Sequence, residues 1–203
     1  CFQIVANNVT LNGMGYNVTG NGALYGKGVD TVGLISASMK NISIRGFYEG
    51  VWAQAGVNWT IANCLFDSNI RGIFVQSYDF NFTGNNFVGN DYGIYTDLET
   101  SARKGIMADN YFNLNNYSLY LDDTDLVNVT NCVINNSLKN AVVISGSSRG
   151  FFGGVVLRNV SIYNTSSSYY DLYVTAGDPD MFSDAYFIDM NIANYTIGSK
   201  IYV

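Results

Sequence analysis

The chain has 203 residues, enough for one domain with a sizeable core. Only 13% of its residues are charged and 48% are hydrophobic, which favours a folded, β-rich protein over a disordered one. A net charge of -6 excludes nucleic acid as an expected partner, because binding to phosphates requires clustered Lys and Arg. No apolar stretch approaches the about 20 residues that cross a bilayer, so we expect no transmembrane segment.

A four-residue motif recurs along the chain, made of a small or turn residue followed by an apolar, variable, apolar triplet. Such alternation is typical of a short β-strand. Gly28 and Val29 begin the series. The later triplets follow in steps of 21 to 30 residues, at Val51–Ala53, Ile73–Val75, Ile94–Thr96, Leu119–Leu121, Val142–Ile144, Leu172–Val174 and Ile201–Val203.

A second apolar column precedes the first in each repeat. Its members are Phe66, Phe87, Phe112, Ile134, Ile162 and Ile192. Three residues before each of them lies a residue that tolerates left-handed backbone angles, namely Asn63, Gly84, Asp109, Asn131, Asn159 or Asp189. The pattern therefore predicts the same turn in every coil.

These repeats predict an all-β fold, a right-handed, single-stranded parallel β-helix of roughly eight coils with about 22 residues per coil. Extra residues at 99–105, 145–154 and 175–185 predict loop insertions. We expect residues 1–203 to form a single β-helix domain, either a fragment of a longer chain or a protomer of a larger assembly. Coil-like sequence at both ends favours covered ends, as in a head-to-tail polymer.

The opening segment Ile4–Gly20 resembles the NosD-like parallel β-helix domains, also grouped as carbohydrate-binding and sugar-hydrolase (pectin-lyase-like) repeats. Later segments, Asn58–Asn63 and Asn128–Asn131, resemble the same repeat. The resemblance covers nearly the whole chain and implies the β-helix fold, as in archaeal and bacterial surface proteins. It says little about activity, because this architecture hosts unrelated functions.

Copper delivery is implied by the NosD resemblance, whose periplasmic members are associated with copper. The sequence contains no histidine and only five scattered methionines, so the ligands that copper prefers are missing. We therefore expect no copper site and no obligatory cofactor.

An acidic edge follows two neighbouring triplets and offers a candidate calcium site. Asp97 and Glu99 follow one triplet, and Asp122 and Asp123 follow the next. Stacked coils would bring these carboxylates together, which suits the six to eight oxygen ligands of Ca²⁺. With Arg103 and Lys104 in the insertion, the edge would also suit a calcium-dependent polysaccharide lyase. The alternative is that the aspartates only cap turns, and we expect the protein not to be an enzyme.

Glycosylation sequons are unusually frequent. About four would be expected by chance, whereas the sequence has eleven, at Asn8, Asn17, Asn41, Asn58, Asn81, Asn116, Asn128, Asn135, Asn159, Asn164 and Asn194. N-glycans on a secreted, extracellular or cell-surface protein would explain the excess. The alternative is that Asn-x-Thr belongs to the repeat itself, with Asn in the turn and Thr in the strand.

Aromatic residues occupy the outward place of four successive triplets, at Trp52, Phe74, Tyr95 and Tyr120, and again of the last two, at Tyr173 and Tyr202. This column is predicted to contact either sugar rings or another subunit. The sequence thus favours a structural, N-glycosylated surface protein that self-assembles into a filament or surface layer. A carbohydrate-binding module that binds polysaccharide is the alternative.

The three cysteines are not expected to form a disulfide. Cys64 and Cys132 fall in one repeat column three coils apart, roughly 14 Å at the usual strand spacing. A disulfide requires Cα atoms within about 7 Å, so both are predicted to be free, buried thiols and Cys1 is unpaired by elimination.

Overall fold

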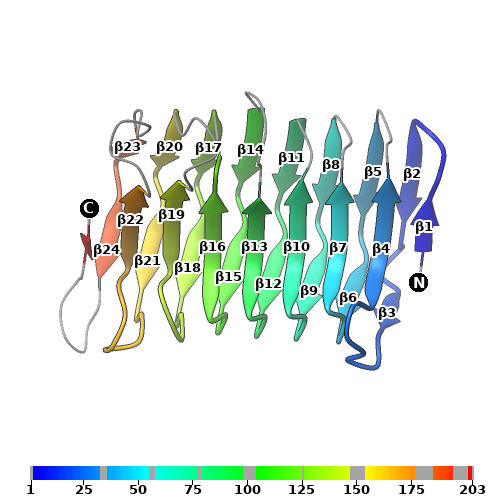
Figure 1. Cartoon of the computed structure of the whole chain (residues 1–203), viewed down its shortest axis with the longest axis horizontal. Coiled ribbons are helices and arrows are strands. Elements are labelled where there is room, and N and C mark those ends of the chain that lie inside the picture. The colour runs from blue at the N-terminus through cyan, green and yellow to red at the C-terminus, as the bar shows by residue number, and fades with distance from the viewer. Residues whose placement is uncertain are drawn as a thin grey trace.

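The computed structural model describes residues 2–32, 36–54, 58–76, 79–97, 104–124, 126–146, 154–176, 185–193 and 201–202. These residues form parallel β-strands that wind into a solenoid with three sheets, and they contain no helix. The coils succeed one another along the long axis, with the two termini at opposite ends (Figure 1). The predicted class, an all-β parallel solenoid, is confirmed.

Each coil contributes one strand to each sheet. The first sheet contains β1 (Phe2–Ile4), β4 (Lys27–Val32), β7 (Glu49–Gln54), β10 (Arg71–Gln76), β13 (Tyr92–Asp97), β16 (Tyr117–Asp122), β19 (Val142–Gly146), β22 (Leu172–Ala176) and β25 (Ile201–Tyr202). The second contains β2 (Val9–Asn12), β5 (Ala37–Lys40), β8 (Trp59–Ala62), β11 (Asp79–Thr83), β14 (Lys104–Ala108), β17 (Val127–Thr130), β20 (Val155–Arg158) and β23 (Ala185–Ile188). The third contains β3 (Asn17–Thr19), β6 (Ser43–Arg45), β9 (Leu65–Asp67), β12 (Asn86–Val88), β15 (Tyr111–Asn113), β18 (Val133–Asn135), β21 (Ser161–Tyr163) and β24 (Asn191–Ala193).

The expected coil number and period need a small correction. The first sheet has nine strands and the other two have eight, so the count of eight coils was slightly off. Successive turns are about 25 residues apart rather than 22. The shorter period holds in the middle, where Val51, Ile73 and Ile94 are register partners. The spacing is longer at the ends, where Phe2 pairs with Val29 and Leu172 pairs with Ile201.

The predicted turn column is confirmed by the backbone angles. Its members all have positive φ, at Asn63 (55°), Gly84 (65°), Asp109 (56°), Asn131 (53°), Asn159 (51°) and Asp189 (51°). Asn and Asp tolerate this conformation better than other non-glycine residues because their side chains bond locally. The same corner therefore repeats between the second and third sheets.

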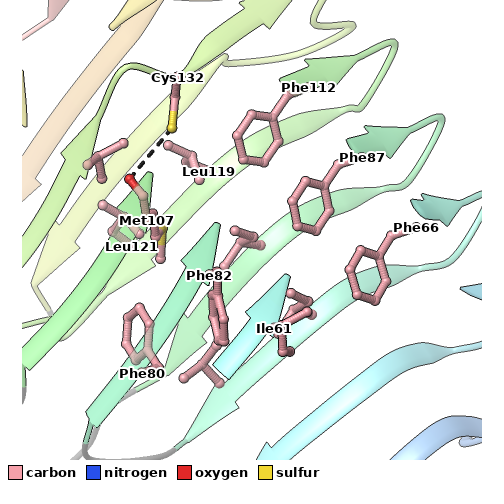
Figure 2. Close-up of a cluster of buried hydrophobic side chains, with 14 of the residues drawn as sticks. Ile61, Phe66, Phe80, Phe82, Phe87, Met107, Phe112, Leu119, Leu121 and Cys132 are labelled. Carbon is pink, nitrogen blue, oxygen red and sulfur yellow. Dashed lines mark hydrogen bonds between the residues drawn. The ribbon is translucent and has the colours of Figure 1, made fainter. Parts of the chain in front are cut away.

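The interior is filled by columns of like residues. Phe66, Phe87 and Phe112 are in register on the third sheet, and their rings stack with centroids 5.0 and 4.8 Å apart. Figure 2 shows these three rings aligned, one from each successive strand. The first residues of the triplets are buried as far as Leu172, as the alternation predicts, whereas Ile201 on the last strand is exposed.

Two ladders of buried asparagines cross the coils beside this apolar core. In the longer ladder, Asn90 Oδ1 accepts hydrogen bonds from the backbone N and the Nδ2 of Asn69, at 2.9 and 3.1 Å. Asn90 Nδ2 donates to Phe66 O (2.9 Å) and to Asn115 Oδ1 (3.0 Å). The shorter ladder joins Asn85 to Asn110 in the same way. Each asparagine thus satisfies backbone groups at a corner where the strand ladder is interrupted.

Cysteines flank the shorter ladder. Cys64 N donates to Asn85 Oδ1 at 3.0 Å, and Asn110 Nδ2 lies 4.0 Å from Cys132 Sγ. Both thiols are free and buried, as predicted from their separation, and burial raises the pKa of each to about 11. Cys1 lies outside the described residues.

Replacing Asn90 with Ala tests the ladder. The change leaves the backbone amide of Asn69 and the Phe66 carbonyl without their side-chain partner. Asn115 Oδ1 loses the bond from Nδ2 but keeps the one from the backbone N of residue 90. Each buried unsatisfied group costs about 1–3 kcal/mol. We expect Asn90→Ala to lower the free energy of unfolding by about 3–5 kcal/mol, measured by urea denaturation. Asn86→Ala, on an exposed position of β12, is the control and should change it little. Equal losses in the two variants would contradict the role of the ladder.

Candidate functional site

The outer face of the first sheet carries the densest group of functional side chains. Strands β7, β10, β13 and β16 each present three positions there, two of them two residues apart, as strand alternation requires, and the third at the first residue of the strand. Strand pairing places these positions in three columns. We call them the aromatic column (Trp52, Phe74, Tyr95, Tyr120), the charged column (Lys27, Glu49, Arg71, Tyr92, Tyr117) and the polar column (Gln54, Gln76, Asp97, Asp122).

The aromatic column has the predicted register, but its rings largely cover one another. The Phe74 and Tyr95 rings stack with centroids 5.4 Å apart and planes 12° apart. Trp52 lies 6.1 Å from Phe74, and Lys27 Nζ lies 3.0 Å from the Trp52 ring centroid. Phe74 is only 6% exposed. The expected outward direction is correct, but Trp52 and Phe74 offer little free ring face to a sugar.

The charged column was missed in the sequence. Arg71 Nη1 pairs with Glu49 Oε1 at 3.1 Å, and its guanidinium carbon lies 4.4 Å from the Phe74 centroid and 4.9 Å from that of Tyr95. A signal was available, because Lys27, Glu49 and Arg71 each directly precede the glycine of their repeat. Burial raises the pKa of Glu49, although the positive charges of Arg71 and Lys27 oppose the shift.

The polar column contains two of the predicted calcium ligands. Asp97 and Asp122 are direct register partners. Gln76 Nε2 donates to Asp97 Oδ2 (3.4 Å), and Ser145 Oγ donates to Asp122 Oδ1 (2.6 Å). Burial raises the pKa of Asp122 despite the Ser145 hydrogen bond, and the charges of Asp123 and Asp97 raise it further.

The expected calcium site is not supported by this geometry. Asp123 is buried at a turn with a φ of 46°, and Glu99 lies outside the described residues. No group of three or more His, Cys, Asp or Glu side chains that could hold a metal occurs in the described part of the chain. Arg103 is likewise outside it, and Lys104 pairs in register with Asp79 on the second sheet. Turn formation and side-chain hydrogen bonds account for the described acids.

The sequon asparagines fall into two groups. Those with exposed side chains are Asn8, Asn17, Asn41, Asn58, Asn81, Asn128 and Asn159. Those that are half-buried are Asn116, Asn135 and Asn164, and Asn194 lies outside the described residues. The sequence motif is the same in both groups, so strand alternation and the neighbouring coils determine which asparagine side chains are exposed.

Fold and outer face together define a β-solenoid protein whose core and surface are both built from register columns. Residues 4–198 match the model of the family described as "Periplasmic copper-binding protein (NosD)". The chain belongs to the NosD family, as the resemblance of its opening segment and later repeats indicated. No curated protein matches the chain. Among the described residues, no helix is long and apolar enough to cross a membrane.

The donors of this chain do not fit the copper of the family description. Histidine is absent from all 203 residues. Cys64 and Cys132 are buried at opposite ends of an asparagine ladder, and their raised pKa values keep the thiols protonated at neutral pH. Met39 and Met107 are fully buried in the core. Copper ligands must be deprotonated or neutral donors that converge on one point, and these residues do not converge.

Asp122→Asn distinguishes a partly buried carboxylate from a calcium ligand. Because the folded-state pKa of Asp122 is raised, its ionised form destabilises the fold above that pKa, and the penalty disappears below the ordinary value of about 4. We expect Asp122→Asn to raise the melting temperature at pH 7 in EDTA, with the gain vanishing toward pH 4. Circular dichroism melts across this range provide the measurement. A calcium-dependent rise in the parent's melting temperature that this variant abolishes would contradict the expectation.

Proposed function

We propose that this chain is a structural, N-glycosylated β-solenoid of the extracytoplasmic side, in the periplasm or at the cell surface. It assembles end to end into a filament or surface layer and has no catalytic role. The location follows the periplasmic description of its family. The assembly rests on one observation, that large apolar side chains are exposed on the first and last described coils, among them Phe2 (44%) and Ile201 (55%).

The end formed by β1–β3 is apolar and uncharged. No Asp, Glu, Lys or Arg occurs between Phe2 and Gly26. Its exposed large apolar side chains are Phe2, Val5, Met14, Tyr16, Leu24 and Tyr25. The unpaired strand edges here lack the charges with which exposed edges usually resist association.

The opposite end, formed by β23–β25, presents matching residues. Tyr186, Phe187, Ile201 and Tyr202 are exposed there. Following the register through the sheets, one core column runs from Leu11 to Phe187 and another from Val18 to Ile192. A second copy stacked in register would therefore continue both columns with apolar contacts.

A head-to-tail contact between two copies is heterologous and does not close on itself, which favours a linear polymer.

The assembly is tested by placing a charge at one end. Phe187→Lys puts an ammonium into the apolar junction, where an unpaired charge costs several kcal/mol. We expect the parent to sediment as polymers at micromolar concentration and Phe187→Lys as a monomer with an unchanged circular dichroism spectrum. Ile106→Lys, which charges an exposed apolar position on the side of the solenoid, should still polymerise. A monomeric parent, or equal assembly of both variants, would refute the proposal.

Carbohydrate binding is the second candidate, supported by Tyr120. Its ring meets Tyr95 edge-on at 60°, and its register partner on the other side is Val143 rather than an aromatic residue. Tyr92 and Tyr117 also meet this ring edge-on, at 80° and 89°, so the side toward Val143 is the one without an aromatic register partner. Asp97 and Asp122 lie in the neighbouring column. This combination suits stacking on a sugar ring.

Calorimetric titration with soluble polysaccharide fragments tests this candidate. If Tyr120 stacks on sugar, Tyr120→Ala should weaken binding at least tenfold, which corresponds to about 1.4 kcal/mol. Trp52→Ala, whose ring is already covered by Lys27, is the matched control and should bind like the parent. Absence of binding by the parent would leave the structural role alone.

A further inference from the structure

The outer face of the second sheet is the most regularly arranged sequon-bearing surface. One register column of outward residues runs along it, namely Thr10, Ser38, Thr60, Asn81, Ile106, Asn128, Val156 and Tyr186. Asn81 and Asn128 lie two strands apart in this column, roughly 10 Å at the usual strand spacing. Asn58 directly precedes β8 on the same face.

Strand alternation orients the sequons of Asn81 and Asn128, whereas Asn58 lies in a turn just before β8, with a φ of 60°. The middle residue of each is buried in the core: Trp59 is 1% exposed, and Phe82 and Val129 are fully buried. The asparagine before it is exposed, and the threonine after it points to the same side. In the sequons of Asn81 and Asn128, both groups that an acceptor sequon needs are therefore presented together on one strand, and in the third sequon an exposed Asn58 directly precedes the strand that carries Thr60.

The acceptor amides on this face are free to react. Asn81 Oδ1 accepts a hydrogen bond from Thr83 Oγ1 at 2.8 Å, which leaves Nδ2 without a partner among the described residues. In the same part of the chain, the side chains of Asn58 and Asn128 form no hydrogen bond. A sequon hydroxyl bonded to its own asparagine also fixes the direction of the amide.

A shallow groove on this face offers a seat for the first sugar. It has a volume of about 340 Å³, and Asn58, Thr60, Asn81 and Ile106 are among its lining residues. Ile106 is 46% exposed and lies in the column between Asn81 and Asn128. An attached glycan would cover this apolar side chain, whose exposure in the middle of a strand is otherwise unexplained.

The three half-buried sequon asparagines have a different geometry. Asn116 Nδ2 donates to Asp91 Oδ1, and Asn164 Nδ2 donates to Asn135 Oδ1 at 3.4 Å. The hydroxyls of Ser118 and Ser137, which complete the sequons of Asn116 and Asn135, bond to each other inside the protein. In each of these sequons an amide or a hydroxyl group is thus already engaged inside the folded chain.

We propose that Asn58, Asn81 and Asn128 carry N-glycans, which makes the outer face of the second sheet the glycosylated face. The inference rests on the extracytoplasmic location of the proposed function. In the reaction, Nδ2 bonds to the anomeric carbon of an oligosaccharide carried on a polyprenyl phosphate or diphosphate. The anomeric C–O bond breaks, the phosphate leaves with the electron pair, and the amide loses one proton.

The remaining sequons receive no glycan in this proposal. Asn41 Nδ2 donates to Asn12 Oδ1 (3.2 Å), and Asn159 Nδ2 donates to Asn131 Oδ1 (2.9 Å), so both amides are held in turns. Asn8 and Asn17 lie on the first coil, at the end that the proposed assembly covers. Asn194 is outside the described residues.

Glycopeptide mass spectrometry tests the proposal on the full chain, secreted from a host that glycosylates Asn-x-Ser/Thr. We expect glycan at Asn58, Asn81 and Asn128 and none at Asn116, Asn135 and Asn164. Thr60→Ala, Thr83→Ala and Thr130→Ala should each remove the mass of one glycan, whereas Thr83→Ser keeps the sequon and should retain it.

Two results would overturn the glycosylated face. One is glycan at any of the three half-buried asparagines, and the other is bare asparagine at two or more of the three proposed sites. Sedimentation of the same material decides the end-to-end assembly separately. A monomer glycosylated at the three sites would refute the assembly but keep the glycosylated face, and an unglycosylated polymer would do the reverse.

Discussion

The structure depends on one constraint, that no coil can bury its own apolar face or satisfy its own corner amides. Each coil must find both kinds of partner on its neighbour, at the same place in the repeat. The phenylalanine column meets the first need, with ring centroids 4.8 to 5.0 Å apart. The asparagine ladders meet the second: Asn90, for example, caps backbone groups of the coil before it and bonds to Asn115 of the coil after it. Like residues therefore stack on like residues.

The same constraint shapes the outer surface. Strand spacing near 4.8 Å brings successive aromatic side chains into contact, so the outward rings stack on one another as the inward ones do. Arg71 and Lys27 then cover the ring faces nearest the first coils. The sequence predicted this aromatic column to be a binding surface. At Trp52 and Phe74, the side chains instead form a second packed layer outside the sheet. Beyond Tyr120, Val143 interrupts the column, so that ring has no aromatic register partner on that side.

Ends and sides of the solenoid have different chemistry. The ends expose core columns and carry few charges, whereas the side formed by the second sheet carries hydroxyl and amide groups. Growth along the axis and glycans on one side are compatible, because the two use different surfaces. The family description names copper, but the side chains of this chain do not suit it. The sequence has the repeat that builds the fold and contains no histidine. The columns of a solenoid can keep the fold while the exposed residues change.

The sequence by itself determined the solenoid, its inward residues and its turns, because period-two alternation and left-handed turn residues are local properties repeated in every coil. Cys64 and Cys132 could be predicted as free thiols because a column position converts directly into a distance. Tertiary structure alone decided contacts between coils: the charged column over the aromatic rings, the two asparagine ladders and the separation of exposed from half-buried sequons. Asn81 and Asn116 carry the same motif. Only the neighbouring coils leave the first amide without a partner and bind the second to Asp91.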